Sequence, residues 1–404
     1  MRRQSLMSRP LRLNLAMLMA GLGSFSLLYC PQPLMPLLAS HFAISPASSS
    51  LAVALTSAPM AIGILAGSVL SDRVHRRTLM ASSLFLAAVL TLITSLTSDW
   101  HILLGLRVLT GLALAGVPAV AMAHISAETD SVSIGSAMGV YIAGTGVGGL
   151  LGRLGASFAA DLLDWRWAFA LTGLSGILIA VAFALLLPTS RVAQEFRAAR
   201  PAEILGDFQR LMKDRVLGFL YLEAFIFMGV FLTVFNYTGF HLAEPPFALS
   251  QAAIGSIFIL FLIGSAASPG IGWLSGRLGR DKVFRASLVV LLAGVIVTLS
   301  MSTWIYILGL ILVIVGFFGA HAVASSWVGV RAAAAAGKAA ALYLFFYHLG
   351  SAAVSSLGGL AWQGGGWPLV VGYAASLCLL ALAATFAVRR EAGPMRTTVA
   401  GQTS

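Results

Sequence analysis

Residues 68–77 read SVLSDRVHRR and residues 272–281 read GWLSGRLGRD, so a short charged motif occurs twice in the chain. Both copies follow a long apolar segment, and both contain Leu-Ser followed by two arginines at matching positions. The correspondence extends to aromatic residues downstream, which pair as Trp100 with Trp304, Tyr141 with Tyr343 and Trp165 with Trp367. These matches predict that the chain contains a duplicated unit.

The composition is that of a membrane protein. Of the 404 residues, 59% are hydrophobic and only 10% are charged, and the mean hydropathy is +0.93. Soluble domains carry about 25% charged residues, so a soluble chain is not expected. A helix needs about 20 apolar residues to cross the hydrocarbon layer. The apolar runs of this kind lie at 13–38, 47–70, 78–97, 101–123, 134–159, 166–187, 216–240, 251–275, 283–302, 304–327, 339–361 and 368–388. We therefore predict an all-α membrane protein with twelve transmembrane helices in two six-helix repeats.

The distribution of basic residues predicts the orientation in the membrane. The formal net charge is +11, but the basic residues form no patch or stripe with interleaved aromatics, so we expect no nucleic-acid partner. If the N-terminus is cytoplasmic, the Lys and Arg residues fall in cytoplasmic segments, except for Arg107, Arg153 and Arg166. Lys and Arg in short loops favour the cytoplasmic side. Both termini are therefore predicted to be cytoplasmic.

Residues 188–215 separate the two predicted halves and carry charges of both signs. After Pro201, apolar residues recur at helical spacing, which predicts an amphipathic helix on the membrane surface. We expect an N-terminal six-helix bundle at 1–187, a cytoplasmic loop with this surface helix at 188–215, and a C-terminal six-helix bundle with a short tail at 216–404. The loop could serve as a simple strap or as a regulatory segment.

The first motif resembles the cytoplasmic signature of the major facilitator superfamily, Gly-x-Leu-Ala/Ser-Asp-Arg-x-Gly-Arg-Arg/Lys, between helices 2 and 3. The matching residues are Leu70, Ser71, Asp72, Arg73, Arg76 and Arg77, whereas Ser68 and His75 replace the two glycines. Arg107 and Gly111 match the helix 4 signature of the family. The similarity covers almost the whole chain. It points to the twelve-helix drug:proton antiporter and sugar-efflux branch, and residues 28–33 and 235–237 are similar to YnfM-type transporters of the bacterial inner membrane.

Two further sets of residues take their expected roles from this resemblance. Residues 144–149 resemble the helix 5 antiporter signature Gly-Pro-x-x-Gly-Gly, with Thr145 in place of proline. This antiporter-like motif comprises Gly144, Gly148, Gly149 and Gly152, whose spacing also permits close helix packing.

The second set is a cytoplasmic gate motif. In the family, the acidic residue that corresponds to Asp72 latches the cytoplasmic gate. We therefore expect a gate motif made of Asp72, Arg73, Arg76, Arg77, Arg277 and Arg280. Alternatively, the arginines only fix the orientation of the chain in the membrane.

Ionisable residues inside predicted spans are the candidates for proton coupling. A charge at the centre of a bilayer costs about 3 kcal/mol or more, so it needs a partner, a wet cavity or a function. Glu223, Arg107 and His321 are such residues. Because desolvation favours the neutral form of a carboxyl group, Glu223 could bind a proton in one state and release it when wetted. A hydrogen-bonded packing role stays open for His321, and Arg153 could either reach the outer interface or act in the site.

The resemblance implies that helices 1, 4, 7 and 10 line a central cavity. Isolated polar residues fall on these four helices, and on helix 1 aromatic and polar residues share one face. The candidate cavity residues are Phe25, Tyr29, Gln32, Arg107, Phe227, Tyr237 and His321. For the aromatic residues, ordinary helix packing remains the alternative.

These features predict a secondary transporter that works by alternating access and exports a drug-like molecule, a sugar or a metabolite by proton antiport. A proton-coupled importer or sugar facilitator would share the fold, and a non-transporting receptor is the alternative of another class. The chain has no P-loop and no nucleophile elbow or clustered metal ligands, so we expect no enzyme, no cofactor and no metal. The expected partners are a small-molecule substrate, protons and the lipid bilayer, and the chain is expected to act as a monomer in the bacterial inner membrane.

Overall fold

The computed structural model describes residues 8–70, 74–129, 133–188, 201–332 and 335–391, which are helical apart from short connections. The first elements are α1 (Arg9–Tyr29), the 3-10 turn η1 (Gln32–Leu34), α2 (Met35–His41), α3 (Pro46–Leu70), α4 (Arg76–Thr94), α5 (Trp100–Leu114), α6 (Gly116–Glu128), α7 (Ile134–Leu162) and α8 (Trp165–Leu186). They are followed by α9 (Pro201–Lys213), α10 (Arg215–Ala243), α11 (Gln251–Ser256), η2 (Ile257–Leu260), α12 (Phe261–Leu278), α13 (Arg280–Val297), α14 (Thr303–Arg331) and α15 (Ala336–Glu391).

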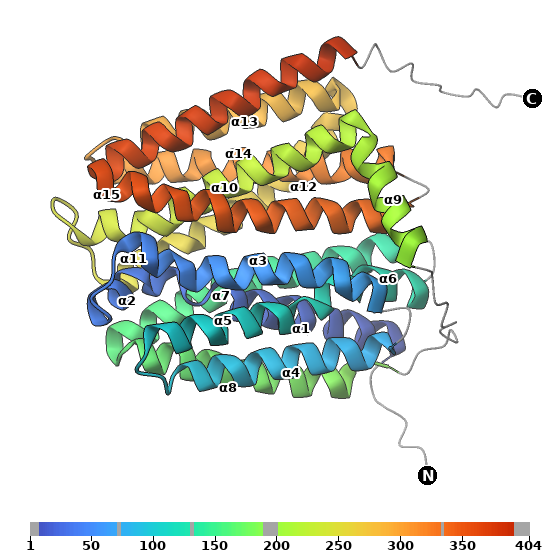
Figure 1. Cartoon of the computed structure of the whole chain (residues 1–404), viewed down its shortest axis with the longest axis horizontal. Helices are drawn as coiled ribbons and strands as arrows, with labels where there is room; N and C mark the ends of the chain where they lie inside the picture. The colour runs from blue at the N-terminus through green and yellow to red at the C-terminus, as the bar shows by residue number, and fades with distance from the viewer. Residues whose placement is uncertain (1–7, 71–73, 130–132, 189–200, 333–334, 392–404) are drawn as a thin grey trace, which may run out of the picture.

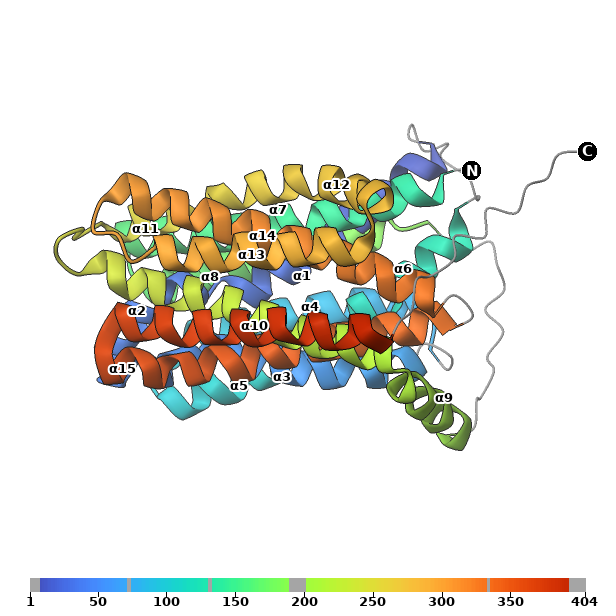
Figure 2. The ribbon, with the colours of Figure 1, turned by 90° about the horizontal axis from the view of Figure 1, so that it is seen from above.

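The long helices lie side by side along the long axis of the molecule (Figure 1). Elements α1 to α8 form one side of the bundle and α10 to α15 form the other, and we call these the N-terminal half and the C-terminal half. Helix α9 lies at one end of the bundle in both views (Figures 1 and 2), and we call this the α9 end. The opposite end, where α2 and α11 lie, is the α2–α11 end.

Within the described residues, 9 helical segments are long and apolar enough to cross a membrane. One of them contains most of α15, which consists of two arms because Gly365 and Gly366 leave the helical conformation and the chain folds back there (Figure 1). Helices α7, with 29 residues, and α13, with 18, are not among these segments. The first turns of α13 are charged, with Arg280, Asp281, Lys282 and Arg285. Most helices begin and end within a few residues of the predicted apolar runs, and the count of twelve crossings stays a prediction.

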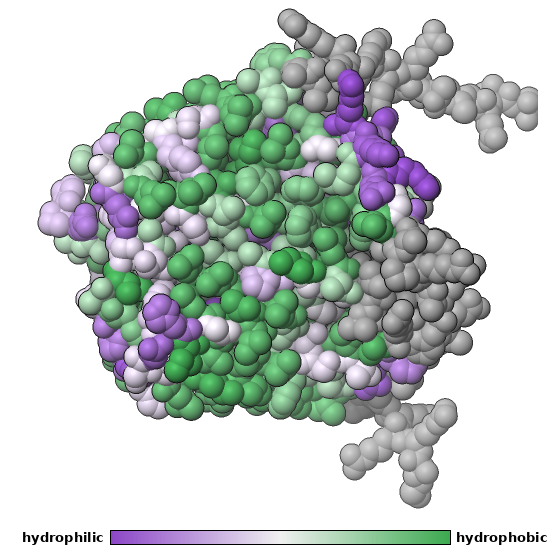
Figure 3. All heavy atoms as spheres, viewed as in Figure 1, coloured by the Kyte–Doolittle hydropathy of each residue, from purple (hydrophilic) through white to green (hydrophobic). Residues whose placement is uncertain are grey.

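The outer surface is suited to lipid. Figure 3 shows apolar side chains across the middle of one face and hydrophilic ones toward its two ends. Large apolar side chains such as Leu178 and Leu185 are exposed on α8. An exposed apolar surface of this extent would aggregate in water, whereas in a bilayer it contacts hydrocarbon.

Helices α1 and α7 touch backbone to backbone through the predicted glycines. A Cβ atom at Gly144 would lie 2.5 Å from the Leu18 carbonyl oxygen, and one at Gly152 would lie 2.6 Å from that of Ser26. Gly148 meets the backbone of Leu22 in the same way. Any larger side chain would push the two helices apart. The close packing predicted for these glycines is therefore present in the structure.

An ion pair joins helix α9 to the C-terminal half. Lys338 of α15 donates to Asp207 of α9, and the hydrogen bond together with the positive charge holds the pKa of Asp207 below its usual range. At the start of α10, Arg331 Nε lies 3.0 Å from Asp214 Oδ2. Leu211 is buried, while Leu205 and Met212 remain exposed. The predicted helix is present, with one apolar side covered in part.

Candidate functional site

Side-chain hydrogen bonds join the two halves near the α2–α11 end. Gln32 Nε2 in η1 donates to Asn236 Oδ1 of α10 at 2.7 Å. Gln251 Nε2 of α11 donates to the Pro33 carbonyl oxygen at 2.6 Å and lies 3.4 Å from Ser157 Oγ of α7. By contrast, the Arg9–Glu128 ion pair of 2.6 Å lies within the N-terminal half. The named polar contacts therefore hold the halves together at the α2–α11 end.

Arg153 of α7 lies in the centre of this region and is 3% exposed. Its Nε donates to Gln32 Oε1 at 2.6 Å and its Nη1 donates to the Gly149 carbonyl oxygen at 2.7 Å. The guanidinium carbon lies 4.0 Å from the centre of the Tyr29 ring and 5.1 Å from the rings of Phe258 and Phe261. The cation is thus enclosed by aromatic rings from both halves, a favourable arrangement for a desolvated arginine.

Hydrogen-bond chemistry determines how the two amide groups of this cluster are oriented. Arginine has donors only, so the oxygen of Gln32 must face Arg153 and its nitrogen must face Asn236. The oxygen of Asn236 then accepts from Gln32, which leaves Asn236 Nδ2 as a donor. This nitrogen is buried and has no acceptor among the described residues. The chain Arg153–Gln32–Asn236 therefore ends in an unused N–H group at the boundary between the halves.

The C-terminal half contributes a tyrosine and a histidine beside this cluster. Tyr347 of α15 lies within electrostatic range of Arg153 and Tyr29. Its ring centre is 5.0 Å from that of His321 in α14, and His321 Nδ1 lies 2.8 Å from the Tyr343 hydroxyl. Tyr347 and His321 are half-buried. We call Tyr29, Gln32, Arg153, Asn236 and Tyr347 the central cluster.

Arg107 lies apart from the central cluster, inside the N-terminal half, and is 0% exposed. Its Nη2 donates to the carbonyl oxygens of Leu27 and Leu28 at 3.0 and 3.1 Å, and its Nε donates to that of Ala52 at 3.2 Å. Pro31 has no N–H group, so the Leu27 carbonyl loses its helical partner where α1 ends. Arg107 supplies the missing donor and thereby ties α5 to α1 and α3.

Glu223 is 0% exposed, and neither of its carboxyl oxygens has a hydrogen-bond partner among the described residues. One turn before it and one turn after it on α10, Phe219 and Phe227 pack against Phe284 of α13 at 6.4 and 6.5 Å between ring centres. Cys378, in the second arm of α15, lies within electrostatic range of Glu223. The carboxyl group is therefore enclosed within the C-terminal half.

The other predicted cavity residues fall into two groups. The ring of Phe25 lies 6.0 Å from that of Tyr29, which places it next to the central cluster. Phe227 packs within the C-terminal half and reaches the His321 ring at 6.4 Å. Tyr237 donates to the Ser355 carbonyl oxygen at 3.2 Å and stacks near Trp362. The structure thus brings Phe25, Tyr29 and Gln32 to one site, with His321 linked to it through Tyr347.

The gate motif is described in part. Asp72 and Arg73 lie outside the described residues. Arg76 and Arg77 begin α4, and Arg77 Nη2 donates to the Ala184 carbonyl oxygen of α8 at 2.9 Å. In the second copy, Arg277 lies 4.0 Å from the Trp273 ring centre and Arg280 begins α13. The gate role of these residues stays a prediction.

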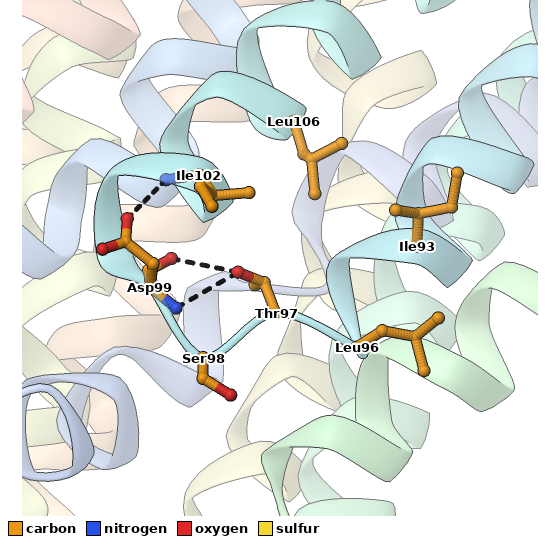
Figure 4. A pocket seen from close by; sticks show the side chains of 7 residues that line it. All are labelled: Ile93, Leu96, Thr97, Ser98, Asp99, Ile102 and Leu106. Carbon is orange, nitrogen blue, oxygen red and sulfur yellow. Dashed lines mark hydrogen bonds between the residues drawn. The ribbon is translucent and has the colours of Figure 1, made fainter.

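A surface hollow of about 490 Å³ lies where α4 connects to α5 (Figure 4). Apart from Thr97, Ser98 and Asp99 its walls are apolar, and Asp99 is occupied in capping α5 through the Ile102 N–H at 2.9 Å. This hollow lies within the N-terminal half and contains none of the predicted site residues. Among the described residues, no group of three or more His, Cys, Asp or Glu side chains is placed to hold a metal.

Three members of the central cluster were not among the predicted site residues. They are Arg153, for which the sequence pattern allows two interpretations, Asn236, which is marked only by a resemblance, and Tyr347. The available signal was a basic residue inside an apolar run with no acid in the same helix turn. Which way such a side chain points depends on packing against α1 and η2, so the sequence pattern alone does not decide it.

Comparison with known proteins identifies the family. The family model of the Major Facilitator Superfamily matches residues 13–264. The chain is 40% identical over 374 residues to the inner membrane transport protein YnfM of Escherichia coli K12, covering 92% of this chain and 89% of that protein. It is 36% identical over 371 residues to the MFS-type transporter YybF of Bacillus subtilis 168, covering 92% of each.

Solved structures share the fold at low sequence identity. A bacterial homologue of the human lysosomal transporter Spinster superposes with a TM-score of 0.75 at 16% identity, covering 93% of this chain and 96% of that one. The nucleoside transporter NupG gives a TM-score of 0.72 at 12% identity, covering 94% of this chain and 98% of that one. The chain therefore belongs to the major facilitator superfamily and is a multi-pass transporter of the bacterial inner membrane.

Proposed function

We propose that the protein exports a small molecule by proton antiport, and that the substrate binds between the N-terminal and C-terminal halves. The central cluster is the observation that carries this proposal, because it combines polar and aromatic side chains from both halves. Alternating access requires a site to which both halves contribute side chains, so that contacts with the substrate form and break as one half rocks against the other.

In this proposal the two halves are six-helix units at 1–187 and 216–404, joined by the segment 188–215, and the chain crosses the membrane twelve times. The α9 end is cytoplasmic, with both termini on that side. Basic residues at this end, such as Arg12, Arg77 and Lys338, support the assignment because Lys and Arg favour the cytoplasmic side. The Gln32–Asn236 hydrogen bond and the hydrogen bonds from Gln251 to Pro33 and Ser157 then belong to the outer gate.

Proton coupling is assigned to Glu223, with His321 as the second candidate. The carboxyl group of Glu223 is enclosed among apolar side chains and has no hydrogen-bond partner in the described part of the chain, so it would carry a proton, and wetting during the conformational change would release it. His321 is connected to the central cluster through Tyr347, which supports a role near the substrate. Arg107, bound to three backbone carbonyls, supports the helix break in α1 and acts on coupling only through α1. One proton crossing 100 mV supplies about 2.3 kcal/mol, enough for about a fiftyfold gradient of a neutral solute.

The test uses inside-out membrane vesicles with an imposed pH gradient, acid inside, and a panel of radiolabelled solutes. We expect the wild type to accumulate its substrate when the gradient is present, and Glu223→Gln to retain exchange of substrate down its gradient but to lose accumulation. Thr233→Val on the same helix is the matched control and should behave as the wild type. Undiminished accumulation in Glu223→Gln would remove Glu223 from proton coupling.

The same vesicles separate the alternatives. A proton-coupled importer would accumulate substrate in right-side-out vesicles with the gradient directed inward and would lose it from inside-out vesicles. A facilitator would equilibrate the substrate whatever the pH gradient. A receptor would bind the solute without moving it. The close α1–α7 packing at Gly144, Gly148 and Gly152 supports the export assignment through the antiporter-like motif.

A further inference from the structure

The central cluster holds a positive charge with no opposing charge. Arg153 is buried, and among the described residues no carboxylate forms an ion pair with it. The groups in its electrostatic range are Tyr29, Cys30 and Tyr347. A cation enclosed within the membrane is costly unless a counter-charge or strong acceptors neutralise it. Two neutral acceptors, the Gln32 amide and the Gly149 carbonyl, meet only part of this need.

The donors of the cluster outnumber its acceptors. Arg153 uses Nε and Nη1 in the bonds named above, and its Nη2 makes no hydrogen bond with a described residue. Asn236 is 1% exposed, and its Nδ2 also lacks an acceptor in the described part of the chain. Both nitrogens belong to side chains that bind Gln32. A ligand that supplies oxygen acceptors, and preferably a negative charge, would satisfy both nitrogens.

The walls of the site are apolar and aromatic. Tyr29, Phe258 and Phe261 surround the guanidinium, and Phe231 lies 5.3 Å from Phe261 between ring centres. A sugar would need many paired donors and acceptors along such walls, and a dianion would need a second cation. One cation beside aromatic rings fits one negative charge attached to an apolar body.

We propose that Arg153 and Asn236 bind the carboxylate of a small organic monoanion whose apolar or aromatic body packs against Tyr29 and the phenylalanines. Arg153 Nη2 donates to one carboxylate oxygen and Asn236 Nδ2 to the same group. This inference rests on the proposed function, because it names the class of substrate for the site between the halves.

The test measures binding to the purified protein in detergent, without any gradient, by isothermal titration. The probes are benzoate and octanoate, each compared with its neutral amide, benzamide or octanamide. We expect the wild type to bind each carboxylate about tenfold or more tightly than its amide, since charge-assisted hydrogen bonds are about twice as strong as neutral ones. Equal binding of carboxylates and amides, or no binding of either carboxylate, would overturn the proposal.

Two variants separate binding from folding. Arg153→Met keeps the apolar stem and removes the buried charge, so the protein should stay folded and lose the preference for carboxylates. Asn236→Asp keeps the shape but places an acid beside Gln32, which should exclude carboxylates even though Arg153 is present. Arg166→Gln, which removes a charge at the start of α8, is the matched control and should bind as the wild type. Retained carboxylate preference in folded Arg153→Met would contradict the assignment.

The failure of this inference can be told apart from that of the proposed function. If carboxylates bind through Arg153 but vesicles show no movement driven by the pH gradient, proton-driven export is wrong and the anion site stands. If a neutral or cationic solute is exported equally well by the wild type and Arg153→Met, the anion site is wrong and proton-driven export stands.

Discussion

Gln32 and Asn236, one in the break after α1 and the other on α10, form a buried hydrogen bond of 2.7 Å across the boundary between the two halves. The bond is the middle of a chain that begins at Arg153, and it lies near the α2–α11 end. Gln32 and Arg153 belong to the same half, so a change that draws the halves apart at this end breaks the bond to Asn236 and takes Phe258 and Phe261 away from the guanidinium. Separation of the halves at the α2–α11 end therefore changes the surroundings of the central cluster directly.

Breaking this bond should open the α2–α11 end more often. Ser157, packed against Gly255 at the same boundary and 0% exposed, reports the opening once it is replaced by cysteine. Gln32→Leu in the Ser157→Cys background should raise the rate of labelling by a membrane-impermeant maleimide about fivefold, since a buried hydrogen bond is worth about 1 kcal/mol. The native cysteines, Cys30 and Cys378, are buried and should contribute little.

Thr238→Val is the control for this experiment. Thr238 is on the same helix as Asn236, but its hydroxyl lies 2.9 Å from that of Tyr306, within the C-terminal half. This variant should leave the labelling rate of the cysteine unchanged. If Gln32→Leu and Thr238→Val accelerate labelling equally, the bond between Gln32 and Asn236 does not hold the gate.

The glycine contacts between α1 and α7 predict a position-dependent loss of stability. Gly152→Ala would place a Cβ atom 2.6 Å from the Ser26 carbonyl oxygen, and overpacking of this kind costs about 1 to 3 kcal/mol. The melting temperature in detergent should fall by several degrees. Gly155→Ala, one turn away and with no atom within 4 Å of the added carbon, should be neutral or slightly stabilising. Equal losses in both variants would mean that close α1–α7 packing is not the cause.

Arg107 should matter for stability more than for substrate binding. Replacing it by glutamine removes hydrogen bonds to the Leu27, Leu28 and Ala52 carbonyls in a buried place, and each orphaned buried group costs about 1 to 3 kcal/mol. We expect a clear fall in melting temperature with the same ligand affinity in the fraction that remains folded. A large loss of ligand affinity without loss of stability would contradict this and would show that Arg107 contributes to the substrate site.

Docking of α9 should depend on pH in one direction. Lys338 lowers the pKa of Asp207, so the folded state binds this proton less readily than the unfolded state. The stabilisation is present above the ordinary carboxyl pKa of about 4 and is lost as the pH falls through the lower folded value. Amide exchange in α9, corrected for intrinsic rates, should therefore increase below that pH. In Asp207→Asn, amide exchange in α9 should be fast at neutral pH and should not increase further at low pH. The control Asp281→Asn, on α13, should keep the pH dependence of the wild type.

The fold was largely predictable because hydropathy and charge act on whole segments. The run predicted at 166–187 appears as α8 (Trp165–Leu186), and the run at 283–302 appears as α13 (Arg280–Val297), shifted because its charged start is also helical. The glycine spacing on α7 correctly indicated close packing. These signals are local, and they survive in any arrangement of the neighbouring helices.

The site was less predictable because it depends on where side chains point. Arg107 and Arg153 are both buried arginines, yet one serves the carbonyls released by Pro31 and the other lies between the halves. The difference comes from the break at the end of α1, which turns Leu27 toward Arg107 and brings Gln32 to Arg153. The helix that carries Glu223 was predicted at 216–240 and appears as α10, but Cys378, which lies within electrostatic range of Glu223, comes from a segment distant in the sequence.

Distances between the halves, measured at both ends of one molecule, test alternating access most directly. Spin labels at exposed Ser40 and Glu244 report the α2–α11 end, and labels at Leu11 and Leu278 report the α9 end. Double electron–electron resonance spectroscopy of the protein in nanodiscs, at pH 5.5 and at pH 8, gives both distance distributions. We expect one distance to lengthen while the other shortens, with the pH response absent in Glu223→Gln. Distances that stay constant or change together in the same direction would contradict a carrier that opens to one side at a time.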